Sequence, residues 1–580
     1  MALAALEERP LCKKERRWRF APLPKAGYAQ HSNLLERCLA NRGCLDPNTA
    51  DQFLNPRLKS LADPFLLPDM GKAVERILRA RASAELMLVF GDYDVDGITS
   101  CALLHETLTA LECKVVCQIP HRMEDGYGLT ESAVLRALEL HKPALLIAVD
   151  CGSSSAETIQ LIQQRGVDVI VLDHHQLGSP QPKPIAFVNP KAAVEPRFEE
   201  LCSVGLAFKL AHALAKRGRE AGLPCASALD IRTSLDLVAL GTIADQVPLA
   251  AENRILAHAG LRALSQSTRV GLKALREVSQ CGPEIGVYQV GFQLAPRLNA
   301  AGRLETAEEA LQLLLTNDPA KAAQLARSLD EQNSRRKAVE QEIVEAAIER
   351  VRATFDPAHH YAIVQGDTEW HIGVVGIVAS RVLREFYRPT IILGGAGEEW
   401  RGSGRSIEGF DLAAGLKSCS DLLSRHGGHA MAAGLSMNPA RLEEFRQRFN
   451  DAARTALKPE SLLPILELDA QVRLSELTLA TVLSLEQLEP CGQGNPTVRL
   501  AASGLRLAGD IRRMGAEQQH ARFRVSDGTA TLDVVWWSCV GDPMPSGRFD
   551  LAFEPQVHEY QGMRSVQLKL LDWRPSRAAA

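Results

Sequence analysis

Three apolar segments of strand character each end in an acidic motif, and this repetition constrains the fold more than any other feature. The segments are LMLVF (86–90), ALLIAV (144–149) and VDVIVL (167–172), and they lead into GDYDVDG, VDCG and LDHHQ. Helical patterns lie between them, over 98–111 and 130–141. Strands that alternate with crossover helices form a parallel sheet covered on both faces, which binds ligands where its strands end. We therefore expect the acids to gather at one edge of an α/β sheet.

A fourth acidic motif, ADQVP (244–248), follows a segment with helical periodicity. Its apolar and small residues recur at helical spacing, at Leu235, Leu237, Val238, Leu240, Gly241 and Ala244. A helix over this segment would bring Asp245 to the same sheet edge at the helix end. One acid of the set is therefore expected to come from a helix.

These side chains match the needs of a two-metal phosphodiesterase site. Hydrolysis of a phosphodiester requires an attacking hydroxide, neutralised phosphate charge and a stabilised leaving oxygen, and two divalent ions about 3.5–4 Å apart supply all three. We expect Asp94 and Asp96 each to bind one ion and Asp150 to bridge them, with Asp245 and His174 completing the ligand sets. An imidazole ligand favours Mn²⁺ over Mg²⁺, which prefers oxygen ligands.

Three further residues of these motifs are candidates for the surrounding chemistry. His175 would polarise the phosphate or protonate the leaving oxygen, and Asp173 or Asp92 would support the direct ligands. A calcium loop at 92–97 is disfavoured, because Leu103 stands where a bidentate Glu is required and a strand precedes the loop. Taken singly, each motif would more often be a strand end with a solvated aspartate, so their joint placement carries the prediction.

The rest of the chain predicts three more parts. Residues 319–353 lack Gly and have their only Pro at the start, which favours one long helix. A smaller α/β unit follows, and the short β-type runs of the C-terminal part suggest a small barrel. The expected boundaries are an N-terminal extension over 1–65, a catalytic α/β domain over 66–306, a connecting helix over 307–355, a second α/β lobe over 356–458 and the barrel over 459–580.

Composition places few limits on the partner. The 580 residues carry a net charge of -4, so any contact with nucleic acid would depend on local basic patches. The 13 cysteines include no CxxC pair, and neither a signal peptide nor an apolar run of about 18 residues is present. We therefore expect a cytoplasmic protein that makes no membrane contact.

The motifs together resemble those of the DHH phosphoesterases, named for the triplet at Asp173, His174 and His175, and among them the RecJ-type exonucleases. The resemblance covers nearly the whole chain and is more specific in the later motifs than in the first four. These later motifs are PHRMEDGYGL (120–129), APRLNAAGRLE (295–305), WRGSGRS (400–406), HGGHAMAAG (426–434) and LEPCGQGNP (488–496).

The resemblance implies a fold and an activity. The fold would be a DHH parallel-sheet domain and a smaller DHH-associated α/β domain joined by a long helix, with a C-terminal OB-like β-barrel. The activity would be 5′ to 3′ degradation of single-stranded DNA to 5′-mononucleotides with two Mn²⁺ or Mg²⁺ ions, in DNA repair and recombination. The expected form is a monomer, with a single-strand-binding protein and a RecQ-type helicase as partners.

The resemblance also assigns site residues. It places the metal ligands on the five residues named above, and it implies a 5′-phosphate pocket made of Arg122, Arg303, Ser403 and Arg405. Guanidinium groups bind phosphate bidentately, and Gly402 and Gly404 would let backbone amides approach an anion, although RGSGRS could equally be a plain hairpin turn.

Two more regions are candidates for contact with the strand. In HGGHAMAAG we expect a close approach of the backbone to DNA at Gly428, with His429 near the scissile end. In the predicted barrel, Trp536 and Trp537 are adjacent, so strand alternation turns one of them inward and the other outward, and the sequence does not say which. The cluster Arg335, Arg336 and Lys337 on the long helix would line a DNA path or form a solvated face.

Two other functions stay open at the level of sequence. A hydrolase of short oligonucleotides, cyclic dinucleotides or pyrophosphate would use the same motifs but would need neither a barrel nor a long helix. A non-catalytic DNA-binding scaffold would not need an Asp or His at every ligand position, and all of them are present here.

Overall fold

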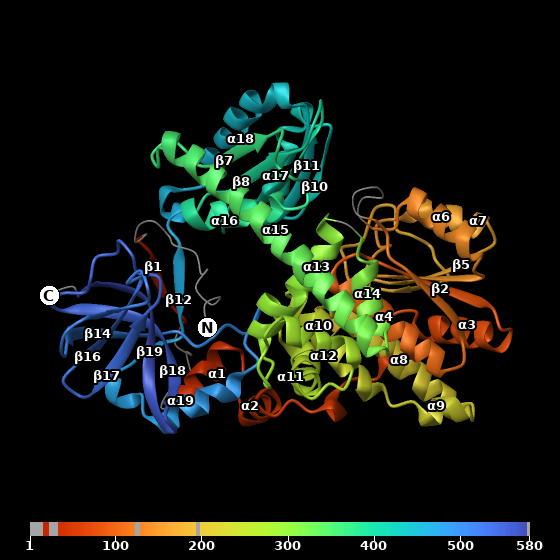
Figure 1. Cartoon of the computed structure of the whole chain (residues 1–580), viewed down its shortest axis with the longest axis horizontal. Helices are drawn as coiled ribbons and strands as arrows, with labels where there is room; N and C mark the ends of the chain where they lie inside the picture. The colour runs from red at the N-terminus through yellow and green to blue at the C-terminus, as the bar shows by residue number, and fades with distance from the viewer. Residues whose placement is uncertain (1–14, 23–32, 122–127, 193–197, 305, 577–580) are drawn as a thin grey trace. The chain divides into compact units, whose positions relative to one another are not determined.

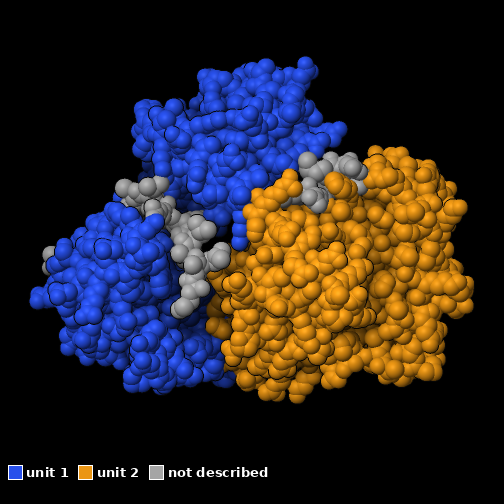
Figure 2. Space-filling view, in the orientation of Figure 1, with its two compact units in different colours: residues 1–50, 337–488, 497–580 blue, residues 51–336, 489–496 orange. Residues whose placement is uncertain are grey.

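The computed structural model describes residues 15–22, 33–121, 128–192, 198–304 and 306–576. Figure 1 shows the whole chain, and Figure 2 distinguishes its two compact units by colour. Unit 2 contains residues 51–336 and 489–496, and unit 1 contains residues 1–50, 337–488 and 497–580. Within the described part of the chain, none of the helices is long and apolar enough to cross a membrane.

A five-stranded parallel sheet forms the centre of unit 2, in the strand order β3-β2-β4-β5-β6. The strands are β2 (Leu86–Gly91), β3 (Lys114–Gln118), β4 (Leu145–Val149), β5 (Asp168–Leu172) and β6 (Ala186–Val188). The chain starts at β2, adds β3 on one side and returns to add β4 on the other. The carboxyl ends of β2 and β4 therefore flank a topological switch point, where such sheets bind ligands.

Helices cover both faces of this sheet, as the sequence predicts (Figure 1). Met87 and Val89 of β2 point into the core formed with α3 (Met70–Ala82), α4 (Val95–Ala110) and α8 (Ser203–Glu220). Leu88 and Phe90 point to the other core, with α6 (Glu131–His141) and α7 (Ala156–Gln164). Continuous apolar strands are needed because both faces are buried.

The remaining helices of unit 2 follow in sequence order. They are α9 (Pro224–Ala228), α10 (Leu235–Ala244), α11 (Ala251–Ser265), α12 (Val270–Val278), the π-helical turn η6 (Gln289–Leu294), α13 (Ala295–Leu304) and α14 (Glu308–Leu315). The predicted long helix is α15 (Pro319–Thr354), a continuous helix of 36 residues.

Unit 1 contains a second sheet and a barrel. The sheet has the order β10-β11-β9-β8-β7, in which only β7 and β8 pair in parallel. Its strands are β7 (Ile363–Asp367), β8 (Thr390–Gly394), β9 (Trp400–Arg405), β10 (Arg425–Gly428) and β11 (Ala432–Met437). The accompanying helices are α16 (Val375–Phe386), α17 (Leu412–Lys417) and α18 (Leu442–Ala456).

The barrel has the strand order β13-β14-β18-β19-β17-β16-β15, and an additional pairing of β14 with β16 closes it. Its strands are β13 (Ala470–Gln471), β14 (Leu500–Leu507), β15 (Arg512–Met514), β16 (His520–Ser526), β17 (Thr531–Trp536), β18 (Phe549–Tyr560) and β19 (Met563–Pro575). Near it lie α1 (Leu34–Asn41) and α19 (Leu479–Leu485), and β1 (Arg17–Phe20) pairs with β12 (Ile465–Leu468). The predicted fold class, with a C-terminal β-barrel, is confirmed.

Candidate metal centre and strand-binding surfaces

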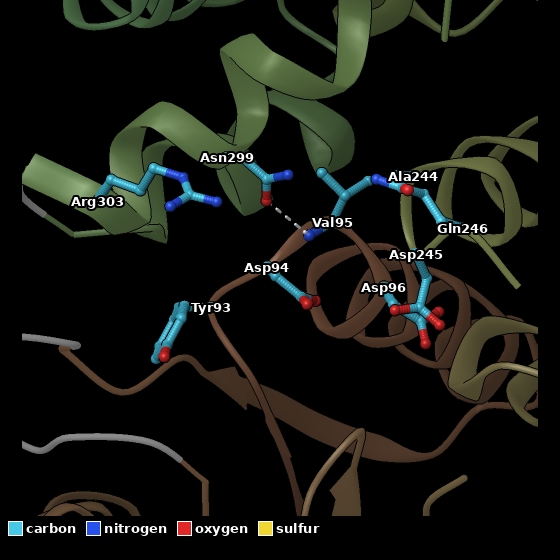
Figure 3. Close-up of a pocket in the computed structure, with 9 residues that line it drawn as sticks. All are labelled: Tyr93, Asp94, Val95, Asp96, Ala244, Asp245, Gln246, Asn299 and Arg303. Atoms are coloured by element: carbon cyan, nitrogen blue, oxygen red, sulfur yellow. Dashed lines mark hydrogen bonds between the residues drawn. The ribbon is translucent and has the colours of Figure 1, made fainter. Parts of the chain in front are cut away.

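The loop after β2 carries the first two acids into one pocket (Figure 3). Asp94 is the N-cap of α4 and accepts a hydrogen bond of 3.1 Å from the Gly97 amide, and Asp96 lies in the first turn of the helix. A Cβ at Gly97 would lie 2.4 Å from the backbone oxygen of Asp92, so no side chain fits there. The motif therefore needs its final glycine to turn this tightly from strand to helix.

The start of α8 holds two of the carboxylates. Asp96 accepts hydrogen bonds from the amides of Ser203 (2.7 Å) and Val204 (2.8 Å), and the Ser203 hydroxyl donates to Asp150 Oδ1 at 2.9 Å. Unpaired amides at a helix N-terminus favour a nearby negative charge. Ser203 therefore links the acids that follow β2 and β4. No pattern in the sequence marks Ser203, because it acts on these acids from far along the chain.

The acids of the pocket strongly disfavour one another's charge. Burial and the nearby Asp94 raise the pKa of Asp96 to about 7, although the two amides oppose the shift. Burial and neighbouring aspartates also raise the pKa of Asp245 to about 8 and the pKa of Asp150 well above its usual range. Buried like charges of this kind are relieved by a bound cation.

His174 lies among these carboxylates as a neutral ring. Its Nε2 is 3.5 Å from Asp150 Oδ1 and 3.5 Å from Asp245 Oδ2, and it has no hydrogen-bond partner among the described residues. Burial and the neighbouring His175 lower the pKa of His174 to about 3. Lys191 Nζ donates to the backbone oxygen of His174 at 2.5 Å and helps to hold this segment in place. A neutral imidazole with an open nitrogen is the form that binds a metal ion.

His175 differs from His174 in its charge state. Its Nδ1 is 2.7 Å from Asp173 Oδ1, and Asp173 Oδ2 accepts a hydrogen bond of 2.9 Å from the Ser153 amide. Burial opposes protonation of His175, but the bond and charge of Asp173 outweigh it and raise the pKa of His175 to about 9. Burial likewise opposes ionisation of Asp173, yet its partners hold the pKa of Asp173 below its usual range. The adjacent histidines therefore differ in charge, because burial dominates at His174, whereas His175 has a carboxylate at hydrogen-bonding distance.

Helices α10 and α13 complete the pocket. As predicted, Asp245 is brought to the sheet edge as the C-cap residue of α10. Asn299 and Arg303 project from α13 into the same cavity of about 210 Å³ (Figure 3). Asn299 Oδ1 accepts a hydrogen bond of 3.1 Å from the amide of Val95, which follows Asp94. Asn299 lies in the APRLNAAGRLE motif, but nothing in the sequence alone predicted a role for this residue.

The residues present fit two divalent ions. Ligand atoms within 4.8 Å of one another form three groups, which are Asp96 with His174 and Asp245, Asp92 with Asp94 and Asp150, and Asp150 with His174 and His175. Asp150 belongs to two of these groups, which suits a bridging ligand. His174 Nε2 and Asp245 Oδ2 are buried atoms without a hydrogen-bond partner among the described residues. Oxygen ligands with one imidazole suit Mn²⁺ or Mg²⁺.

The structure corrects our interpretation of the glycine-rich segment 400–406. It is neither a turn nor a loop, because Trp400–Arg405 forms β9, which pairs with β8 on one side and β11 on the other. Its amides bond within the sheet, so Gly402 and Gly404 do not offer them to an anion. These glycines serve packing, since a Cβ would lie 2.9 Å from Leu393 at position 402 and 2.8 Å from Leu412 at position 404.

Ser403 and Arg405 share the other face of β9. Arg405 Nη1 donates to Ser403 Oγ at 2.9 Å and to the Gly404 oxygen at 2.8 Å. The first turn of α16 lies against them, because a Cβ at Gly376 would be 3.0 Å from Ser403 Oγ and 3.2 Å from Arg405 Nη2. Burial lowers the pKa of the Arg405 guanidinium. A guanidinium and a hydroxyl beside a helix N-terminus can bind an anion.

The HGGHAMAAG segment forms the β10–β11 hairpin at the edge of the same sheet. Gly428 has a φ of 138°, and a Cβ there would lie 2.5 Å from the Ala433 Cα, so glycine is required. His429 is exposed, and its amide donates to the Ala432 oxygen at 2.8 Å in the turn. Gly427 pairs with Gly434, and Gly434 pairs with Ser403, so the sheet face beside Ser403 carries no side chain across two strands.

Other candidate residues are distributed over both units. Arg122 lies in 122–127, outside the described residues. Arg336 on α15 is 7% exposed and is therefore not part of an open cationic surface. In the barrel, Trp536 is 8% exposed and Trp537 is 44% exposed, so Trp537 is the outward-facing member of the pair. Arg522 and Arg524 are exposed on β16, between buried neighbours.

The parallel sheet and its acidic switch point define the class of protein, a metal-dependent phosphoesterase. Three family models match the chain: the DHH family N-terminal domain over 86–242, the DHHA1 domain over 358–455 and the RecJ OB domain over 468–572. The chain is 38% identical to the single-stranded-DNA-specific exonuclease RecJ of Dickeya dadantii, over 92% of this chain and 95% of that protein. The protein of the same name from Bacillus subtilis is 36% identical, over 93% of this chain and 67% of that protein.

Solved structures agree with these sequence matches. RecJ from Thermus thermophilus in complex with Mn²⁺ superposes with a TM-score of 0.82 at 30% identity, over 98% of this chain and 81% of that one. The structure of the same protein with Mg²⁺ superposes with a TM-score of 0.76. This chain belongs to the RecJ family of DHH phosphoesterases, and the resemblance seen in the motifs is confirmed.

Proposed function

We propose that this chain is a metal-dependent exonuclease specific for single-stranded DNA, which works from the 5′ to the 3′ end and releases 5′-mononucleotides in DNA repair and recombination. One observation carries the proposal, the convergence of four acids and a neutral histidine at a switch point in a chain of the RecJ family. The curated relatives are named as single-stranded-DNA-specific exonucleases. The 5′ polarity rests on the family resemblance and on the anion-binding side chains of β9.

Five residues would hold two Mn²⁺ or Mg²⁺ ions: Asp94, Asp96, Asp150, His174 and Asp245. When bound, the ions supply Lewis acidity that neutralises the phosphate and activates the attacking water. The chain itself holds the metal-binding carboxylates in fixed positions. Ser203 orients two of the carboxylates and Asn299 fixes the start of α4, so the ligands need little rearrangement.

His175 would act at the leaving oxygen. With a pKa of about 9, the ring is protonated at neutral pH, and Asp173 occupies its Nδ1. The proton on Nε2 can therefore pass to the departing 3′ oxygen as the bond from that oxygen to phosphorus breaks. Asp92 lies next to the ligands Asp94 and Asp150 and would help to orient them.

Ser403 and Arg405 would bind the 5′-terminal phosphate. Cleavage between phosphorus and the 3′ oxygen of the first nucleotide leaves a new 5′-phosphate on the shortened strand. Each round thus recreates the end that these two residues suit. We assign phosphate binding also to Arg303, which lines the metal pocket, and to Arg122 on the family resemblance alone.

The glycine-lined face around Gly428 would let the strand backbone approach the sheet, with His429 close to the reacting phosphate. Arg522, Arg524 and the outward Trp537 of the barrel would extend the grip on the strand through charge and base stacking. We further propose a cytoplasmic monomer that cooperates with a single-strand-binding protein and a RecQ-type helicase, a proposal that rests on the family alone.

One digestion experiment tests the proposal. A single strand labelled at either end, with or without a 5′-phosphate, is incubated with the protein and Mn²⁺ or Mg²⁺. We expect mononucleotides to be released first from the 5′ end, faster from phosphorylated strands, and little attack on the matching duplex. Release from the 3′ end first, or equal attack on the duplex, would contradict the proposal.

A further inference from the structure

The motif LEPCGQGNP, at residues 488–496, has no part in the site described so far. Residues 489–496 belong to compact unit 2, whereas the residues on both sides of them in the chain belong to unit 1 (Figure 2). The chain therefore leaves unit 1, passes briefly through unit 2 and goes back to unit 1, where it enters β14 of the barrel at Leu500. We call residues 489–496 the return segment.

The return segment packs against the connection between α10 and α11. The Leu249 amide donates a hydrogen bond of 2.7 Å to the backbone oxygen of Gln493. A Cβ at Gly494 would lie 2.8 Å from the Cβ of Pro248, and a Cβ at Gly492 would lie 2.8 Å from Leu249 Cδ1. Both glycines are therefore needed for the segment to approach the connection so closely.

The return segment is itself anchored in unit 2. The buried Arg254, in the first turn of α11, donates from Nη2 to the Glu489 oxygen at 2.9 Å, and its guanidinium lies 3.7 Å from the centre of the Phe53 ring. Within the segment, the buried Asn495 donates from Nδ2 to the Pro490 oxygen at 2.8 Å. The segment therefore has a fixed shape against the start of α11.

The connection that it contacts carries the metal ligand Asp245 and is strained. Asp245 is the C-cap residue of α10, and Gln246 follows it in the pocket of Figure 3. Gln246 has a φ of 60° and Ala251, at the start of α11, has a φ of 44°. Residues other than glycine keep such left-handed conformations only where the surrounding structure imposes them. The return segment supplies part of this support, at Pro248 and Leu249.

Asp245 depends on its backbone more than the other buried acids do. Asp96 and Asp150 each accept a hydrogen bond from Ser203. Asp245 Oδ2 is 3.5 Å from His174 Nε2 and has no hydrogen-bond partner among the described residues. The direction of this carboxylate is therefore set by the end of α10 and by the connection that follows it.

We propose that the return segment positions Asp245, with Gly492 and Gly494 as positioning residues, and so sets the affinity for the ion that Asp245 would bind together with His174 and Asp96. This inference rests on the proposed function and deepens it, because it makes the segment that leads into the barrel a part of the metal centre. The other group of ligands follows β2 and β4 instead, so the affinity for the second ion should not depend on the segment.

The test compares Gly494→Ala with Gly222→Ala. The two glycines lie in unit 2 with φ of 71° and 72°, so both variants carry the same backbone penalty. Only at position 494 does the new Cβ meet Pro248, since nothing lies within 4 Å of a Cβ at position 222. In calorimetric Mn²⁺ titrations of the full chain, Gly494→Ala should weaken one of the two ions about 10- to 100-fold, as is typical for residues that orient a metal ligand. Gly222→Ala should bind both ions like wild type.

Two more measurements show whether the effect passes through Asp245. In the Asp245→Asn background, Gly494→Ala should weaken Mn²⁺ binding little further, because substitutions that act through one another are not additive. In the exonuclease assay, the Mn²⁺ concentration for half-maximal activity should rise in Gly494→Ala, while saturating Mn²⁺ should restore kcat and leave KM for the strand unchanged. A general loss of structure would not be rescued in this way.

Gly492→Ala is the second variant, in case Gly494→Ala does not fold in a thermal unfolding control. Its Cβ meets the movable end of the Leu249 side chain, so the same ion should be weakened to a smaller extent. Wild-type Mn²⁺ affinities in the folded variants, equal weakening of both ions, or full additivity with Asp245→Asn would each overturn the inference. The proposed function fails differently, namely if wild type binds Mn²⁺ but does not degrade single-stranded DNA.

Discussion

The two sheets that carry the site residues place them in different ways. In unit 2 all strands are parallel, and the ligands follow the strand ends, where Asp94 comes after β2 and Asp150 after β4. In unit 1 the strand β9 pairs with antiparallel neighbours, and Ser403 and Arg405 project from one face of the strand instead. In the parallel sheet, site residues lie close together because each follows the end of a strand. In the sheet of unit 1, Ser403 and Arg405 lie close together because alternate residues of a strand point to the same face.

In both sites burial disfavours the charged form of the side chains, which is anionic in unit 2 and cationic in unit 1. Burial and mutual repulsion raise the pKa values of the acids in unit 2, and burial lowers the pKa of Arg405 in unit 1. Each site disfavours its own charge until an ion of the opposite sign arrives. We therefore expect that separate substitutions can remove metal affinity and recognition of the phosphate end.

Asp150→Asn should have the largest effect. The amide oxygen can still accept the bond from Ser203, but the bridging charge is lost, and a metal ion contributes several kcal/mol to transition-state stabilisation. We expect exonuclease activity to fall about a thousandfold or more. Thermal unfolding of the metal-free protein should be unchanged or shifted upward, because a repelled carboxylate is removed. Steady-state kinetics and calorimetric Mn²⁺ titration check both points, with the exposed Glu157→Gln as the control. Normal activity in Asp150→Asn would contradict the role of Asp150 as the bridging ligand.

His175→Gln should rank second. Loss of a positioned general acid typically lowers the rate about 10²- to 10⁴-fold. Mn²⁺ affinity should change little if His175 acts on the leaving oxygen rather than on an ion. Single-turnover rates at saturating Mn²⁺ measure the effect, and a matching loss of metal binding would reassign His175 as a ligand. In Asp173→Asn the pKa of His175 should fall, which moves the alkaline limb of the pH profile to lower pH.

Arg405→Met should have a smaller and more selective effect. A hydrogen bond to a charged group contributes about 1.5–3 kcal/mol, so kcat/KM on 5′-phosphorylated strands should fall about 10- to 150-fold. The rate on strands with a 5′-hydroxyl should change much less, and Mn²⁺ affinity should not change. Arg441→Met, at the N-cap position of α18 and with a side chain 42% exposed, is the matched control. Equal loss on both kinds of end would contradict a role in end recognition.

The smallest effect concerns pH. The carboxyls of Asp96 and Asp245 have folded pKa values of about 7 and 8 against an ordinary value of 3.8, so the folded metal-free protein holds protons that the unfolded chain releases. Its stability should therefore decrease as pH rises from about 4 to 8. Bound ions require the ionised carboxylates, so the rise in Tm produced by Mn²⁺ should increase by a few degrees between pH 6 and 8.5. Differential scanning calorimetry with and without Mn²⁺ checks the sign, and a constant rise in Tm would show that these acids are not the ligands.

Local patterns predicted the parallel-sheet half of the molecule well. The apolar residues before Asp92 and Asp150 form β2 and β4, and the residues with helical spacing before Asp245 form α10. These predictions succeeded because a strand, its end and the following acid are adjacent in the chain. The glycine-rich segment around Ser403 was misjudged for the same reason. Its glycines suggested an anion-binding backbone or a hairpin turn, but the residues that require them, Leu393 and Leu412, belong to other elements.

The sequence by itself determined which acids and histidines are present and that strand ends would bring them to one edge, because periodicity and chain order are local properties. Only the tertiary structure decided their chemical states. His174 and His175 are neighbours with the same side chain, yet burial keeps the first ring neutral, and the bond to Asp173 favours the protonated form of the second. Likewise Ser203 reaches Asp150, and Asn299 reaches the Val95 amide next to Asp94, from helices distant in the sequence. Burial, hydrogen bonding and charge at a site depend on what packs around it, and that packing exists only in the folded chain.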